Sequence, residues 1–206
     1  GDARGLVVNA GANLANLTNS GNITATRSGE TGDAIAVLDT SGTLKTITNS
    51  GAIIAQVAAP TVKADGTTTT TAKATGAAVA LDLSASTGGV TLTQAAPVST
   101  TVTTTYPSTD TVTTATSTST TVTPTIVGAI RFGSGADTFD VQTGNVVGDL
   151  SFGAGADTLN IGGSAVVLGA LRDSNGQLAI NVGKGSLGLT NAETIISPTT
   201  ARLMKR

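Results

Sequence analysis

The segment Gly128-Ala-Ile-Arg-Phe-Gly-Ser-Gly-Ala-Asp-Thr-Phe-Asp-Val141 recurs twenty residues later as Gly148-Asp-Leu-Ser-Phe-Gly-Ala-Gly-Ala-Asp-Thr-Leu-Asn-Ile161. A third, more divergent copy begins at Gly169 and ends at Val182. A fixed period of about twenty residues, made of short apolar strands and glycine corners, is typical of stacked β-coils. The repeat therefore predicts an all-β fold, a parallel β-helix, and the preferred chirality of parallel crossovers predicts that it is right-handed.

Alignment of the three copies predicts core residues that stack from coil to coil. Apolar residues two positions apart share one face of a strand, which we expect to point inward. The expected columns are Ile130, Leu150 and Leu171; Phe139, Leu159 and Ile180; and Val141, Ile161 and Val182. If this spacing held throughout, the chain would supply roughly eight coils and a rod on the order of 40 Å long.

The third copy departs from the other two at the corner between its two strands. It has Asp173 where the first two have Phe132 and Phe152, and Leu178 where they have an aspartate. We expect this corner to repack and to shift register.

The first part of the chain carries a related repeat of longer period. Residues 17–25 recur as residues 47–55, each with an Asn-Ser-Gly corner between two short strands, and residues 32–40 match residues 76–84 in layout. Gly, Asn and Ser turns between strands of three to five residues are the expected corners of a coil.

Two stretches interrupt the repeat, at about 57–75 and 95–124. Both are rich in threonine, and insertions of this kind leave a solenoid stack undisturbed because loop closure costs little extra free energy as a loop lengthens. Alternating Thr and Val in the second stretch favour strands along the sheet edge or a separate hairpin, with a disordered segment as the alternative. We therefore predict a single β-solenoid over residues 1–196 with these two insertions, followed by an irregular tail at 197–206.

The composition excludes several functional classes. Cysteine and histidine are absent, which removes thiol chemistry and the commonest general base, so we predict that the chain is not an enzyme. Charged residues make up 12% and the net charge is −2, with no basic stripe, so nucleic acid is not an expected partner. No apolar run is long enough to span a membrane or act as a signal peptide, and the start at Gly1 suggests a piece of a longer protein.

Asp137 and Asp157 are the candidate metal ligands. Residues 133–139 and 153–159 resemble the calcium-binding nonapeptide of RTX proteins, in which copies come every nine residues and calcium lies between turns. Here the copies are twenty residues apart, so this resemblance implies at most weak calcium binding, and no other cofactor is expected. The alternative is structural: Gly135 and Gly155 adopt positive φ, while the two carboxylates accept hydrogen bonds from corner amides.

Three further sets of side chains carry specific expectations. Asp140, Asn160 and Asn181 fall in one column, where we expect a hydrogen-bonded ladder. Asp137, Asp140, Asp149 and Asp157 would have to gather beside Arg131 to support cleavage of an acidic polysaccharide. A flat threonine array that binds ice or mineral requires Thr-x-Thr pairs on one face, of which 101–103 and 111–113 are examples.

The Thr-Asn-Ser-Gly units, the Gly-Asp-Ala-Ile-Ala-type strands and the Phe-Gly-x-Gly-x-Asp-Thr coils together resemble the passenger regions of bacterial autotransporters, the type V secreted surface proteins. The resemblance covers most of residues 5–196 outside the insertions. It implies an extracellular or cell-surface location, with attachment through an outer-membrane region that is not in this sequence.

The function expected from this resemblance is that of a noncatalytic structural or adhesive segment. Its partners would be cell-surface or glycan ligands, or copies of itself, with no membrane span in this segment. A self-assembling filament or surface-layer subunit is the alternative, because an uncapped coil exposes backbone hydrogen-bonding groups. A β-helix enzyme acting on polysaccharides is the enzymatic alternative.

Overall fold

The computed structural model describes residues 1–28, 31–58, 75–96, 103–106, 113–116 and 123–190. Over these residues all regular elements are strands, and they form three six-stranded parallel sheets and one two-stranded sheet. None of the described residues forms a helix of the length and apolarity that crossing a bilayer requires.

The three parallel sheets, named A, B and C, each take one strand from every coil. Sheet A contains β1 (Ala3–Val8), β4 (Ala34–Asp39), β7 (Ala78–Asp82), β12 (Ala129–Arg131), β15 (Leu150–Phe152) and β18 (Leu171–Asp173). Sheet B contains β2 (Asn16–Asn19), β5 (Thr46–Asn49), β8 (Thr91–Gln94), β13 (Thr138–Val141), β16 (Thr158–Ile161) and β19 (Ala179–Val182). Sheet C contains β3 (Asn22–Ser28), β6 (Ala52–Ala58), β11 (Thr125–Val127), β14 (Asn145–Val147), β17 (Val166–Gly169) and β20 (Ser186–Leu189).

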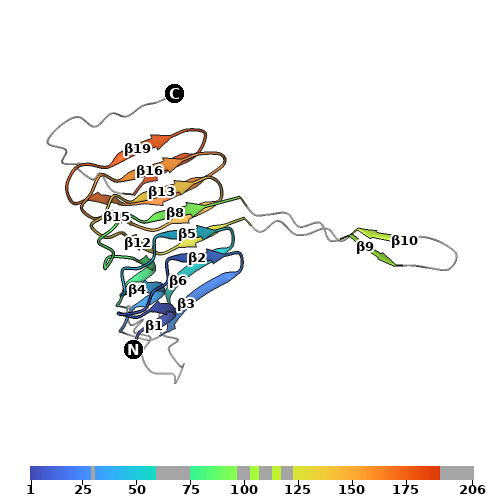
Figure 1. The fold of residues 1–206 in the computed structure, drawn as a ribbon, viewed down its shortest axis with the longest axis horizontal. Coiled ribbons are helices and arrows are strands. Elements are labelled where there is room, and N and C mark those ends of the chain that lie inside the picture. The colour runs from blue at the N-terminus through green and yellow to red at the C-terminus, as the bar shows by residue number, and fades with distance from the viewer. Residues whose placement is uncertain (29–30, 59–74, 97–102, 107–112, 117–122, 191–206) are drawn as a thin grey trace, which may run out of the picture.

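The chain therefore winds through sheets A, B and C in turn, and the fold is a parallel β-helix, as the sequence predicted (Figure 1). Coil 1 comprises β1–β3, coil 2 β4–β6, coil 3 β7, β8 and β11, coil 4 β12–β14, coil 5 β15–β17 and coil 6 β18–β20. The coils stack in chain order from the blue N-terminal end to the orange C-terminal end.

The described residues form six coils, so the expectation of about eight is wrong. The twenty-residue period holds only in the later coils, where Ile130 pairs with Leu150. Earlier coils are longer, since Ala3 pairs with Ala34 and Ala34 pairs with Ala78.

The expected core columns are confirmed strand by strand. In sheet A, Ile130 pairs with Leu150 and Leu150 with Leu171. In sheet B, the pairing of β13, β16 and β19 aligns both remaining columns of the three copies. The earlier repeat is also confirmed, because Leu17 pairs with Ile47 in sheet B and residues 22–28 pair with residues 52–58 in sheet C.

The expected register shift in the third copy is wrong. Phe152 pairs with Asp173 and Thr158 with Ala179, so the pairing continues unbroken across this corner. Asp173 keeps the corner length because its carboxylate accepts the Leu178 N–H at 3.0 Å and the Asn175 N–H at 3.3 Å. The irregularity lies instead between Ala129 and Ile130, where β12 shifts against β7.

Both interruptions fall at corners that border sheet C. The first separates β6 from β7, and its residues 59–74 lie outside the described part of the chain. The second separates β8 from β11 and contains the antiparallel hairpin of β9 (Thr103–Tyr106) and β10 (Thr113–Thr116), which pairs with none of the three sheets. Of the expectations for this stretch, the separate hairpin is the one that the described residues 103–106 and 113–116 form. The tail expected at 197–206 lies outside the described residues.

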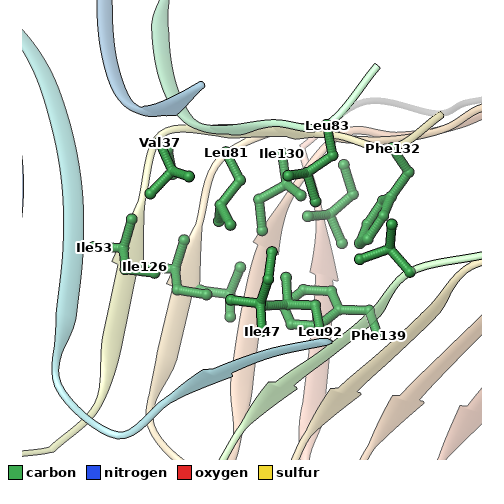
Figure 2. Close-up of a cluster of buried hydrophobic side chains, with 14 of the residues drawn as sticks. Val37, Ile47, Ile53, Leu81, Leu83, Leu92, Ile126, Ile130, Phe132 and Phe139 are labelled. Atoms are coloured by element: carbon green, nitrogen blue, oxygen red, sulfur yellow. The ribbon is translucent and has the colours of Figure 1, made fainter. Parts of the chain in front are cut away.

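The interior is narrow and filled by inward-facing aliphatic side chains. Figure 2 shows Val37, Leu81 and Ile130 of sheet A facing residues of sheets B and C across the core. All three phenylalanines of the chain join this cluster: the Phe132 ring stacks on Phe152 at 5.0 Å and lies 6.2 Å from Phe139. Because equivalent side chains stack from coil to coil in a narrow interior, a chain with only 2% aromatic residues can still pack its core closely.

Candidate functional site

Asp137 and Asp157 lie one above the other in the corner that leads into sheet B. Each carboxylate reaches back to the coil before it: Asp137 Oδ1 accepts the Val90 N–H at 2.7 Å, and Asp157 Oδ1 accepts the Asp137 N–H at 2.8 Å. The two residues are 0% and 1% exposed. This pair of residues, called the aspartate corner below, therefore ties coils 3, 4 and 5 together.

The glycines of this corner permit close approach of the coils. Gly155 has a φ of 136°, and a Cβ built there would lie 2.2 Å from the Gly135 carbonyl oxygen. Positive φ was expected at both glycines, but Gly135 is not among the positive-φ residues. Its role is contact, because a Cβ at Gly135 would lie 2.2 Å from the Gly88 carbonyl carbon.

The second oxygen of each carboxylate lies buried without a hydrogen-bond partner among the described residues. Burial disfavours the charged form and raises the pKa of Asp137 to about 6, with the charge of Asp157 adding to the increase and Val90 N–H and Lys45 opposing it. Burial likewise raises the pKa of Asp157, against the hydrogen bond from the Asp137 N–H. The corner thus has two carboxyl groups that hold protons more strongly than ordinary aspartates.

The donor set for calcium consists of these two buried oxygens, Asp137 Oδ2 and Asp157 Oδ2. The described residues contain no group of three or more His, Cys, Asp or Glu placed to hold a metal ion. Calcium takes six to eight oxygen ligands, so an ion here would need most of them from backbone carbonyls or water. Weak calcium binding at Asp137 and Asp157 stays a prediction.

The expected ladder on the outer face of sheet B is present. Asn160 Nδ2 donates to Asp140 Oδ1, and Asn181 Nδ2 donates to Asn160 Oδ1 at 2.8 Å. This ladder links coils 4, 5 and 6, and it engages the carboxylate of Asp140 in a hydrogen bond. Asp140 therefore lies on sheet B, whereas Arg131 lies on sheet A.

A second ladder, inside the coil, was missed by the sequence analysis. Asn19 Nδ2 donates to Asn49 Oδ1 at 2.8 Å, Asn49 Nδ2 donates to Gln94 Oε1 at 3.4 Å, and Gln94 Nε2 donates to the Thr143 carbonyl at 2.9 Å. The three side chains are at most 6% exposed. The repeated Thr-Asn-Ser-Gly was the available signal, since it places an asparagine at the same corner of two successive coils.

A groove of about 330 Å³ opens on the outer face of sheet A. Its polar lining residues are Ser84, Arg131, Asp149, Ser151 and Arg172. Arg131 pairs with Ser151, and Ser151 with Arg172, so the two arginines lie on one column with the serine between them. The sequence analysis named Arg131 and Asp149 but not this groove. The available signal was the alignment of the three copies, which places Arg131, Ser151 and Arg172 at the same position.

The four aspartates considered for polysaccharide cleavage do not gather beside Arg131. Asp137 and Asp157 are buried in the aspartate corner and Asp140 lies on sheet B, so only Asp149 shares the groove with Arg131.

The threonine pairs named for a flat array are only half described by the structure. Thr103 and Thr113 belong to the hairpin, and Thr101 and Thr111 lie outside the described residues. Sheet B does carry outward pairs in coils 2 and 3, at 46 and 48 and at 91 and 93. Coils 4 to 6 replace the second threonine by the Asp140 ladder, so the array does not continue.

Comparison of the chain with protein-family models, curated proteins and solved structures gave no match.

Proposed function

We propose that this chain is a noncatalytic, extracellular β-helix segment of an autotransporter-like bacterial surface protein, which acts as a stalk and presents adhesive contacts to cell-surface or glycan ligands. The observation that carries the proposal is the continuity of the stack: every coil contributes one strand to each of the three sheets. Such a stack resists bending and spaces whatever it displays away from its anchor. Attachment would run through an outer-membrane region outside this segment.

The positions of the insertions support display as well. Both leave the stack at corners that border sheet C, after β6 and after β8, while β11 resumes pairing with β6 at Ile126 and Ile53. The solenoid therefore tolerates long inserted chain without loss of register, which is what a scaffold for variable contact loops needs.

Surface display tests this proposal. The chain is displayed on a non-adherent bacterium, as it stands and with residues 97–122 replaced by a short Gly-Ser linker, and attachment to glycan-coated and cell-coated surfaces is counted. We expect the intact chain to promote attachment and the deletion to reduce it severalfold, with the same far-ultraviolet circular dichroism per residue of solenoid. Equal attachment by both forms and by the undecorated host would overturn the adhesive role.

Self-association is a second candidate, and the outer face of sheet C favours it. At the outward positions of its six described strands there is no charged side chain, and the outward Val147 and Leu168 are 43% and 42% exposed. An uncharged, partly apolar sheet face is suited to lateral contact with a second copy.

A further inference from the structure

We propose that the groove on sheet A is a binding site for a neutral saccharide, with Arg131, Arg172, Ser84, Ser151 and Asp149 as the hydrogen-bonding groups. This inference rests on the proposed adhesive function and specifies the class of ligand that the solenoid itself would bind, independently of the insertions.

The register brings the polar groups of the groove together. Arg131, Ser151 and Arg172 occupy one outward column on three successive strands, so the arginines are about 10 Å apart at their Cα atoms and flank the serine. Asp149 enters from the corner before β15 and Ser84 from the corner after β7. A ligand above Ser151 is therefore within reach of side chains from four coils.

Existing hydrogen bonds fix one wall of the groove. Asp82 Oδ2 contacts Arg131 Nη1 at 3.3 Å, and Asp82 Oδ1 accepts the Ser84 hydroxyl at 2.6 Å and the Ser84 N–H at 3.2 Å. The Asp82 side chain is itself only 13% exposed, so it is a positioning residue behind the wall rather than a ligand contact. Because the Ser84 hydroxyl donates to Asp82, its lone pairs are left to accept from a ligand.

The opposite end of the groove supplies an acceptor. Asp149 is exposed, and its Oδ1 accepts the Ala170 N–H at 3.1 Å, which holds the carboxylate at the groove edge. A carboxylate accepts about four hydrogen bonds, so Asp149 retains the capacity to accept from ligand hydroxyls.

The balance of charge selects a neutral ligand. Arg131 is paired with Asp82, and Arg172 shares the groove with Asp149, so the guanidinium and carboxylate charges match in number. Donors on one column and an acceptor at the edge suit a molecule with adjacent hydroxyl groups, each of which both donates and accepts. The volume of about 330 Å³ lies at the lower end of small-ligand sites, which fits one or two sugar units.

The expected affinity is low. The one aromatic residue in the lining, Phe132, is 4% exposed, so no ring is presented for a sugar to stack on. Binding that rests on hydrogen bonds in an open groove competes with water, and we expect dissociation constants in the range of about 1 mM.

Nuclear magnetic resonance of the ¹⁵N-labelled chain tests the site. The probes are cellotetraose, maltotetraose, mannotetraose and chitotetraose, with tetragalacturonate as an acidic comparison. At least one neutral probe should shift the backbone amides of β12, β15 and β18 and the Nε–Hε resonances of Arg131 and Arg172. We expect the double variant R131Q/R172Q to weaken that binding at least tenfold.

Arg4→Gln is the matched control. Arg4 lies on β1 of the same sheet and contacts Asp2 at 3.3 Å, with 48% of its side chain exposed against 42% for Arg131, but it lies outside the groove. Its variant should bind the probe as the unaltered chain does. Asp82→Asn should weaken binding partially, since it releases Arg131.

Three results would overturn the proposal: no neutral probe shifts these resonances, the control and the groove variants behave alike, or only tetragalacturonate binds. The attachment assay with residues 97–122 deleted is a separate experiment. A negative result for saccharide binding at the groove would therefore leave the adhesive proposal standing.

Discussion

The aspartate corner buries two carboxyl groups, and burial favours their neutral form. Asp137 has one oxygen on the Val90 N–H and the other buried without a partner among the described residues, and burial raises its pKa to about 6 from the ordinary 3.8. The folded state then binds a proton more tightly than the unfolded chain does. Its contribution to stability is present below pH 4 and declines as the pH rises towards 6.

A pH series of thermal unfolding checks this. Relative to the double variant D137N/D157N, the unaltered chain should lose a few degrees of melting temperature between pH 4.5 and pH 7.5, because its carboxyl groups ionise in the folded corner. Asp140→Asn, on the outer face of sheet B, is the control and should leave the trend unchanged. A melting temperature that rises from pH 4.5 to pH 7.5 relative to the double variant would contradict the assignment.

The same variants test calcium at Asp137 and Asp157. A weak site predicts a small rise in melting temperature that grows with calcium concentration and is absent from D137N/D157N, because a ligand that binds only the folded state stabilises it by mass action. Identical melting temperatures in millimolar calcium and in chelator would end the calcium hypothesis.

At the scale of a single element, the inner ladder shows how one corner is built in two ways. Coils 1 to 3 place Asn19, Asn49 and Gln94 at the end of the sheet B strand, and coil 4 places Val141 at the same position. The amides satisfy backbone carbonyls beside them, such as the Ala52 carbonyl, which accepts from Asn19 Nδ2 at 3.0 Å. The aliphatic coils instead extend the apolar core.

Asn49→Val is predicted to destabilise the fold by about 1–3 kcal/mol, although valine is a good strand former. The substitution removes the hydrogen bonds that the buried side-chain amides of Asn19 and Gln94 make with Asn49. Urea unfolding measures the change. Asn160→Val on the outer ladder is the control, with an expected cost under about 1 kcal/mol because water replaces its bonds. Equal costs for the two variants would argue against the inner ladder as a source of stability.

Much of this element structure was predictable from spacing alone. The columns that begin with Ile130 and Phe139 could be predicted because the copies repeat at a constant interval, so residues one interval apart pair in adjacent strands. The number of coils was not predictable, because corner lengths differ between the early and late coils. The behaviour of Asp173 was missed for a different reason: a carboxylate can replace a phenylalanine when it caps its own corner, and composition alone does not reveal such a cap.

The candidate site was less predictable than the fold. The motif around Asp137 located the corner but suggested a metal, while the burial that raises the pKa depends on neighbouring coils. The groove at Arg131 and Arg172 was only partly predictable: the aligned copies place both arginines and Ser151 in one column, but Ser84 lies outside the copies and joins the groove only in the folded structure.

On the scale of the whole molecule, the three outer faces differ in chemistry. Sheet A carries the charged groove, sheet B carries threonines and the ladder from Asp140, and sheet C is uncharged at its outward positions. The solenoid thus offers three chemically different faces along one axis. The proposed ligand binding and the proposed self-association would therefore use different faces.

Leu168→Lys tests lateral association through sheet C. Sedimentation velocity over a wide concentration range should show association of the unaltered chain and a monomer for the variant, because a lysine charge in an apolar contact is costly to bury. Thr93→Lys on sheet B is the control and should still associate. A monomeric unaltered chain at all concentrations would remove self-association from consideration.

The hairpin of β9 and β10 has a practical consequence for spectroscopy. Tyr106 in β9 is the only tyrosine of the chain, and tryptophan is absent. Intrinsic tyrosine fluorescence therefore reports on the second insertion and is blind to the coils, whose only aromatic residues are phenylalanines. Fluorescence and circular dichroism melting curves that fail to coincide would reveal two independently melting parts within one chain.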